Sequence, residues 1–179
     1  MCFKNFCQVL RIKSYLYICK KIIAMRKEYT LEELLHKVAS YCSISEHCTS
    51  EVDEKLQKWE VAEADRKKII TQLTKDNFIN EKRYAEAFVK DKFRFNKWGK
   101  IKISIALKSK GVDSSLISSA LDVIDEGEYD EMLASILKTK LTGLKYNYEY
   151  EKQGKLFRFA QSRGFENNVI ERALRNISS

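Results

Sequence analysis

The sequence contains no proline and only six glycines in 179 residues. β-sandwiches and barrels need many tight turns, and proline and glycine are common in such turns. Their scarcity argues against an all-β fold, while the abundance of leucine, lysine, glutamate, alanine and isoleucine favours helices. A chain of this length can form one domain with a substantial core or a short array of repeats.

Cysteine occurs only within the first 48 residues, and no CxxC pair or regular disulfide framework is present. This distribution indicates reduced thiols in a protein of the cytoplasm. The two histidines, His36 and His47, lie near Cys42 and Cys48, but the spacing matches no zinc motif. We therefore expect neither a metal site nor a cofactor.

Catalytic signatures are also lacking. The chain has no glycine-rich phosphate loop, no GxSxG elbow and no HExxH motif. Its carboxylates lie on predicted wet helix faces beside lysines, where i,i+4 pairing accounts for them. We expect no catalytic residues and a protein that is not an enzyme.

No uncharged run is long enough to span a membrane, and no membrane partner is expected. Residues 1–25 carry five basic residues and no acidic one, and Arg11 and Lys13 interrupt the apolar core that a signal peptide needs. Three interpretations of this extension are open. It could be a basic amphipathic helix that lies on a membrane or on nucleic acid, a disordered arm, or a translated upstream stretch that precedes the true start at Met25. The sequence MRKEYTLEELL, which opens like an ordinary cytosolic N-terminus, favours the third interpretation.

Helical signals begin at Thr30, which forms a capping box with Glu33. Asn80 is a second N-cap, and Ile79 can close over Tyr84 as a hydrophobic staple. Apolar residues recur at helical spacing after both caps. They predict helices over about 31–42, 49–58 and 63–76, one from about 81, and others over about 128–141, 149–162 and 166–177.

An internal repeat is the most informative feature of the chain. GVDSSLISSALDVI at 111–124 aligns without a gap with GFENNVIERALRNI at 164–177, and EVAEADRKKIITQL at 60–73 fits the same frame. Each glycine suits a helix C′ position, whereas Glu60 replaces it in the first copy and leaves that turn undecided. Units of about 50 residues predict an all-α fold, an elongated array of three tandem three-helix repeats. The expected division is a basic extension 1–25 and repeats 26–77, 78–125 and 126–179.

One segment conflicts with this frame, because Ile101, Ile103, Ile105 and Leu107 alternate with polar or small residues at a strand's period of two. The frame offers no strand for it to pair with. We therefore expect a helix sandwiched between two neighbours.

A basic run extends from Lys90 to Lys110, where eight basic residues stand against one acidic residue, Asp91. The positive charges of such a run repel one another unless a negatively charged partner binds them. Nucleic-acid phosphate and an acidic groove on a protein filament are the two candidate partners. Within it, Phe95 and Trp98 could stack on a base or an arginine. Trp98 could instead plug the core between repeats, since Gly99 beside it suggests close packing.

Several blocks of the chain resemble the RecX family, bacterial regulators of the RecA recombinase. They are RYAEAFVKDKFR at 83–94, WGKIKI at 98–103, ALKSKGV at 106–112 and KLFRFAQSRGF at 155–165. The resemblance implies a nine-helix array, expected to be a monomer, that binds the RecA–single-stranded-DNA filament in DNA repair and suppresses ATP hydrolysis and strand exchange. The residues that would contact the filament or its DNA are Lys90, Lys92, Arg94, Lys97, Trp98, Lys100, Lys102, Lys108 and Lys110. The alternatives are a stand-alone DNA- or RNA-binding module and a scaffold whose basic face only provides solubility.

Overall fold

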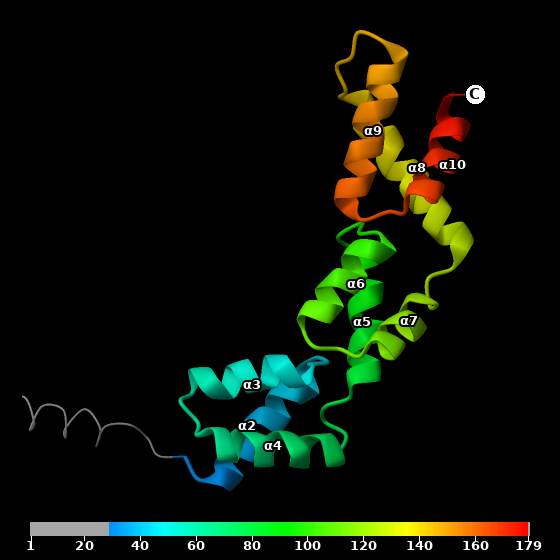
Figure 1. Cartoon of the computed structure of the whole chain (residues 1–179). Helices are drawn as coiled ribbons and strands as arrows, with labels where there is room; N and C mark the ends of the chain where they lie inside the picture. Colours follow the sequence, from blue (N-terminus) through cyan, green and yellow to red (C-terminus); the bar gives the residue numbers. More distant parts are fainter. Residues whose placement is uncertain (1–28, 179) are drawn as a thin grey trace, which may run out of the picture. The chain divides into compact units, whose positions relative to one another are not determined.

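The computed structural model describes residues 29–178, without the side chain of Ser178, so the predicted extension 1–25 lies outside the described residues. The described part consists of nine α-helices and contains no strand, which confirms the predicted all-α class (Figure 1). The helices are α2 (Leu31–Ile44), α3 (Thr49–Lys58), α4 (Glu63–Lys75), α5 (Glu81–Arg94), α6 (Lys100–Ser109), α7 (Ser114–Leu121), α8 (Glu126–Thr142), α9 (Glu149–Arg163) and α10 (Asn167–Ser178).

Side-chain caps fix where several helices begin. The Thr30 hydroxyl accepts a hydrogen bond from the Glu33 N–H at 3.2 Å, and the Glu33 carboxylate accepts one from the Thr30 N–H at 2.9 Å. The predicted capping box is therefore confirmed. The Asn80 side chain accepts from the Arg83 N–H, as predicted. Asp113 and Asp125 cap α7 and α8 in the same manner, satisfying backbone donors that would otherwise have no partner.

Four helices of the described chain end in the same type of turn. The residues at its left-handed position are Glu60, Asn77, Gly111 and Gly164, with φ of 60°, 61°, 80° and 86°. In each case the next N–H donates to the carbonyl five residues earlier, as Val61 does to Leu56 at 3.1 Å and Phe165 does to Ala160 at 3.3 Å. This is the Schellman arrangement. Glu60 thus adopts the backbone conformation of the glycines in the other two copies, and the repeat frame is intact at its first turn.

The segment with strand-like alternation is helix α6, as predicted. Ile103 and Leu107 are completely buried. The expectation that neighbours cover α6 on both sides is wrong, because Ile101 is 45% and Ile105 63% exposed. Residues two positions apart point to nearly opposite sides of a helix, so Ile101 and Ile105 lie opposite Ile103, and only the side of Ile103 is covered.

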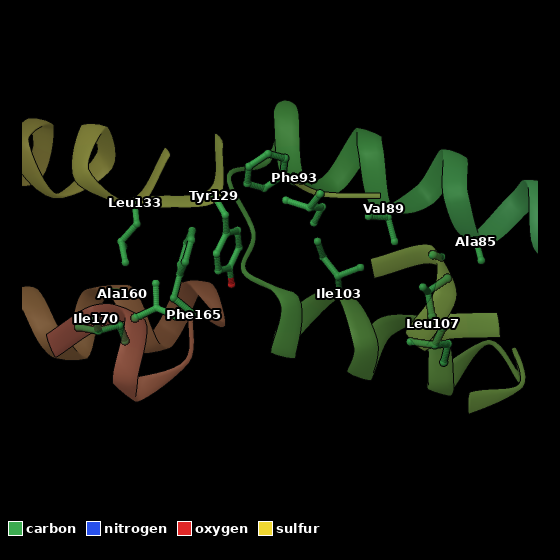
Figure 2. Close-up of a cluster of buried hydrophobic side chains, with 14 of the residues drawn as sticks. Ala85, Val89, Phe93, Ile103, Leu107, Tyr129, Leu133, Ala160, Phe165 and Ile170 are labelled. Carbon is green, nitrogen blue, oxygen red and sulfur yellow. The ribbon is translucent and has the colours of Figure 1, made fainter. Parts of the chain in front are cut away.

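The helices pack in local groups. Helices α3 and α4 pack together, α5 and α6 pack with α7 and with each other, and α8, α9 and α10 form a third mutually packed set. A continuous buried cluster runs through α5 to α10, and its rings Phe93, Tyr129 and Phe165 follow one another at centroid distances of 5.8 and 5.0 Å (Figure 2). The residue boundaries of the three repeats stay a prediction.

Within residues 29–178, no helix combines the length and the apolar character needed to cross a lipid bilayer.

Candidate interaction surface

The basic run occupies the second half of α5, the connection 95–99 and all of α6. The connection is tight, because the Trp98 N–H donates to the Lys92 carbonyl at 3.1 Å. It also holds Lys97 at a φ of 56°, in the left-handed region that side chains other than glycine rarely adopt. Strained backbone of this kind persists only where the surrounding structure imposes it.

Direct backbone contact joins α6 to the turn between α9 and α10. The Gly99 N–H donates to the Arg163 carbonyl at 2.8 Å, and the Ile101 N–H donates to the Gly164 carbonyl at 3.0 Å. A Cβ on Gly99 would lie 2.3 Å from the Gly164 oxygen, far inside any real contact. The close packing predicted from Gly99 is confirmed, and we call this contact between Gly99 and Gly164 the glycine junction.

Tyr129 of α8 reinforces the glycine junction from within the core. Its hydroxyl donates to a Glu166 carboxylate oxygen at 2.5 Å and accepts from the Lys100 N–H at 2.9 Å. Burial and the bond to Glu166 both raise the pKa of Tyr129, so the phenol stays protonated and can donate. The Lys100 ammonium lies 5.0 Å from the centre of the same ring, so Lys100 is tied to the junction by its backbone and its side chain.

Trp98 is half-buried and packs against the core cluster. The ammonium groups of Lys92 and Lys102 lie 5.6 and 4.8 Å from its ring centroid, distances at which a cation is attracted to an indole. The Lys102 ammonium also donates to the Ser162 carbonyl at 3.3 Å. Trp98 therefore serves as part of the core, whereas Phe95 is 80% exposed and is available to a partner.

Lys110 is engaged at a second contact, which links α6 to α3. Its ammonium donates to Glu51 at 2.5 Å, and the same carboxylate accepts from Tyr84 at 2.8 Å and bonds His47 at 3.0 Å. Burial alone would raise the pKa of Glu51, but the bonds from Lys110, His47 and Tyr84 outweigh it and hold that pKa below its usual value. We call this set the Glu51 junction, and Lys110 has a structural role in it.

The other predicted residues are more open. The Arg94 guanidinium lies 3.7 Å from Glu128, and both side chains are largely exposed, so this pair contributes little stability. Lys90, Lys97 and Lys108 have no ion-pair partner within residues 29–178. The positive charge of the run is therefore not neutralised by an ion pair at these three side chains.

A groove of about 520 Å³ next to Lys97 brings in cations that the sequence reasoning missed. Lys97, Lys140 and Arg163 line it, together with hydroxyl side chains and the ring of Phe159, and no carboxylate is among its lining residues in the described chain. Lys140 lies outside the four sequence blocks that resemble the RecX family. Arg163 belongs to the block at 155–165 but was not among the predicted contact residues. Their proximity to Lys97 depends on the glycine junction, which no local pattern could have indicated.

Within residues 29–178, nine helices, a repeated helix-ending turn and a cationic surface centred on α5 and α6 define an all-α repeat protein that presents positive charge. A model of the second three-helix domain of RecX matches residues 80–121. The chain is 31% identical over 132 residues to the regulatory protein RecX of Acinetobacter baylyi, a match that covers 74% of this chain and 80% of that relative. The chain belongs to the RecX family.

Other relatives are longer than this chain. It is 25% identical to the regulatory protein RecX of Oceanobacillus iheyensis over 158 residues and 32% identical to that of Clostridium beijerinckii over 130 residues. The chain spans 58% and 60% of their lengths. A crystal structure of RecX from Lactobacillus salivarius shares the fold with a TM-score of 0.74 at 22% identity, covering 83% of this chain and 96% of that one. The relatives carry the name of regulatory proteins.

Proposed function

We propose that this protein binds the filament that a RecA-type recombinase forms on single-stranded DNA and lowers its rates of ATP hydrolysis and strand exchange. Membership of the RecX family supplies the partner. The observation that carries the proposal is the cationic surface of α5 and α6, where Lys90, Lys97 and Lys108 lack carboxylate partners within the described residues. Such charge favours association with a polyanionic assembly.

The predicted contact residues differ in the contacts that they already make within the protein. Lys110 is held in the Glu51 junction, and Lys100 and Lys102 have contacts at the glycine junction. Lys90, Lys97 and Lys108, which have no ion-pair partner in the described residues, are the side chains expected to contact the filament. Trp98 acts indirectly, by fixing the connection between α5 and α6 from its half-buried position.

The test is a charge reversal confined to the three open lysines. A variant carrying Lys90→Glu, Lys97→Glu and Lys108→Glu should keep a helical circular-dichroism spectrum and lose inhibition of the recombinase's DNA-dependent ATPase. The matched control reverses three exposed lysines on other helices, Lys58→Glu, Lys75→Glu and Lys138→Glu, and changes the net charge equally. Inhibition equal in the two variants would overturn the assignment of this surface. If both variants keep inhibition, the three lysines are not needed, and if both lose it, the effect follows net charge alone.

A stand-alone nucleic-acid-binding module is the second candidate function. It is favoured by the carboxylate-free groove of Lys97, Lys140 and Arg163 and by the exposed ring of Phe95. That function predicts steep salt dependence, because each phosphate neutralised on a single strand adds roughly 0.7 to the slope of log affinity against log salt. A module of this kind would bind bare single-stranded DNA as tightly as the filament.

A further inference from the structure

The outer side of α6 carries two neighbouring aliphatic side chains that the described chain does not cover. Ile101 is 45% and Ile105 63% exposed, and a spacing of four residues places them next to each other on one helix face. Single exposed aliphatic residues are common on protein surfaces and need no explanation. Here two lie side by side, and isoleucine is a poorer helix former than alanine at an exposed position. Neither helix formation nor core packing accounts for the pair.

Positive charge borders the two isoleucines. Lys108 lies seven residues after Ile101, on the same stripe of the helix, because successive residues are about 100° apart around the axis. It is exposed and has no ion-pair partner in the described range. Lys102 lies on the far side of Ile105, with its ammonium drawn over Trp98. We call Ile101, Ile105 and Lys108 the α6 ridge.

The composition of the α6 ridge distinguishes between kinds of partner. Nucleic acid is bound through cations, hydrogen-bonding groups and flat rings, and branched aliphatic side chains offer nothing to phosphate. Protein interfaces instead have an apolar centre surrounded by a polar or charged rim. A pair of isoleucines bordered by lysines matches the second pattern, with carboxylates as the complementary charge.

We propose that the α6 ridge docks an acidic protein surface with an apolar centre, provided by the recombinase subunits of the filament. This inference rests on the proposed function and specifies which component of the filament the site meets. The isoleucines supply the buried centre of the interface, and Lys108 pairs with a carboxylate at its rim. The DNA of the filament then contacts other parts of the cationic surface.

The experiment compares the double variant Ile101→Ala, Ile105→Ala with a control, Ile44→Ala, Val123→Ala, which truncates two exposed aliphatic residues elsewhere. Four quantities are measured on full-length protein: the concentration giving half-inhibition of the filament ATPase, affinity for a bare oligo-dT strand, the unfolding midpoint, and mass by sedimentation. In the α6 variant the half-inhibiting concentration should rise at least about tenfold, as for truncation of an interface centre. Its oligo-dT affinity should stay within about twofold of the parent, its midpoint should not fall, and the control should inhibit like the parent.

Three outcomes would overturn this inference while leaving the proposed function intact. The α6 variant could inhibit as well as the parent, or its affinity for oligo-dT could fall in parallel, which would make nucleic acid the occupant. The parent could also sediment as a dimer that the variant disrupts, which would make the ridge a contact between two copies of this chain. If the parent itself leaves the ATPase unchanged, the proposed function fails and the inference fails with it, a result visible without any variant.

Discussion

The two ends of α6 are held by opposite means. At its N-terminus the glycine junction brings backbone against backbone, with N–H to carbonyl distances of 2.8 and 3.0 Å and no side chain between. At its C-terminus the Glu51 junction is built from side chains around one partly buried carboxylate. The first contact depends on the absence of a Cβ atom, and the second depends on charge. The first should therefore respond to steric change, and the second to mutation of charge and to pH.

The largest effect is expected at the glycine junction. Gly99→Ala would place its Cβ 2.3 Å from the Gly164 oxygen, so the backbones must separate. We expect unfolding free energy to fall by about 3 kcal/mol, the upper range for overpacking a tight site. Gly143→Ala is the control, because a Cβ there meets nothing within 4 Å. Urea denaturation gives both values, and a Gly99→Ala protein as stable as the control would contradict the junction.

The Glu51 junction should be weaker and dependent on pH. Glu51→Gln keeps the shape of the side chain but removes the negative charge that pairs with Lys110. The Glu51 side chain is 25% exposed and that of Lys110 is 30% exposed. We expect a loss of about 1.5 kcal/mol at pH 7, below the value for a fully buried pair. Glu131→Gln, at an exposed position on α8, is the control.

The pH dependence of that difference has a definite sign. The pKa of Glu51 is lowered in the folded protein from an ordinary value of 4.5, so its contribution is complete above that value and is lost as pH falls through the lower folded pKa. The stability gap between parent and Glu51→Gln should therefore shrink when urea titrations are repeated at progressively lower pH below 4.5. A gap that widens on acidification would assign the effect to another group.

Lys97, which precedes the glycine junction, provides a smaller test. Its φ of 56° is unfavourable for a residue with a Cβ, and Lys97→Gly should raise stability by about 1 kcal/mol. Lys97→Ala loses the same charge but keeps the Cβ, so it should show no such gain. If Lys97 binds the filament, both variants lose affinity, which makes the glycine variant more stable and less active. Equal thermal stability of the two variants would show that the backbone there is unstrained.

The smallest effect should come from a glycine outside both junctions. Helix α9 continues through Gly154, where an added Cβ would meet only the Arg158 side chain, at 3.6 Å. Gly154→Ala should therefore stabilise the protein by about 0.7 kcal/mol through helix propensity alone. A calorimetric midpoint that falls instead would mean that α9 is not a regular helix at this point.

Local features of the fold could be predicted from the sequence, and long-range ones could not. The capping box of Thr30, the N-cap at Asn80 and the helical state of α6 follow from neighbouring residues. The contact of Gly99 with Gly164 and the pairing of Lys110 with Glu51 join residues far apart in the chain, and a spacing pattern contains no information on them. The exposure of Ile101 and Ile105 was missed for the same reason, since it depends on which neighbours α6 has.

The candidate surface shows the same division. Charge counting located the run from Lys90 to Lys110, but could not separate Lys110, committed to Glu51, from Lys108, which has no ion pair in the described chain. It also could not place Lys140 and Arg163 beside Lys97. A one-dimensional pattern identifies a charged segment, whereas the folded chain determines which charges already have partners.

The most direct test of the account is a comparison of binding to the recombinase–single-stranded-DNA filament and to the same DNA without recombinase, by fluorescence anisotropy of the labelled protein. We predict saturable binding to the filament at least about tenfold tighter than to bare DNA, accompanied by a fall in ATP hydrolysis that saturates over the same concentrations. Equal affinity for filament and bare DNA, with an unchanged rate of ATP hydrolysis, would contradict the account.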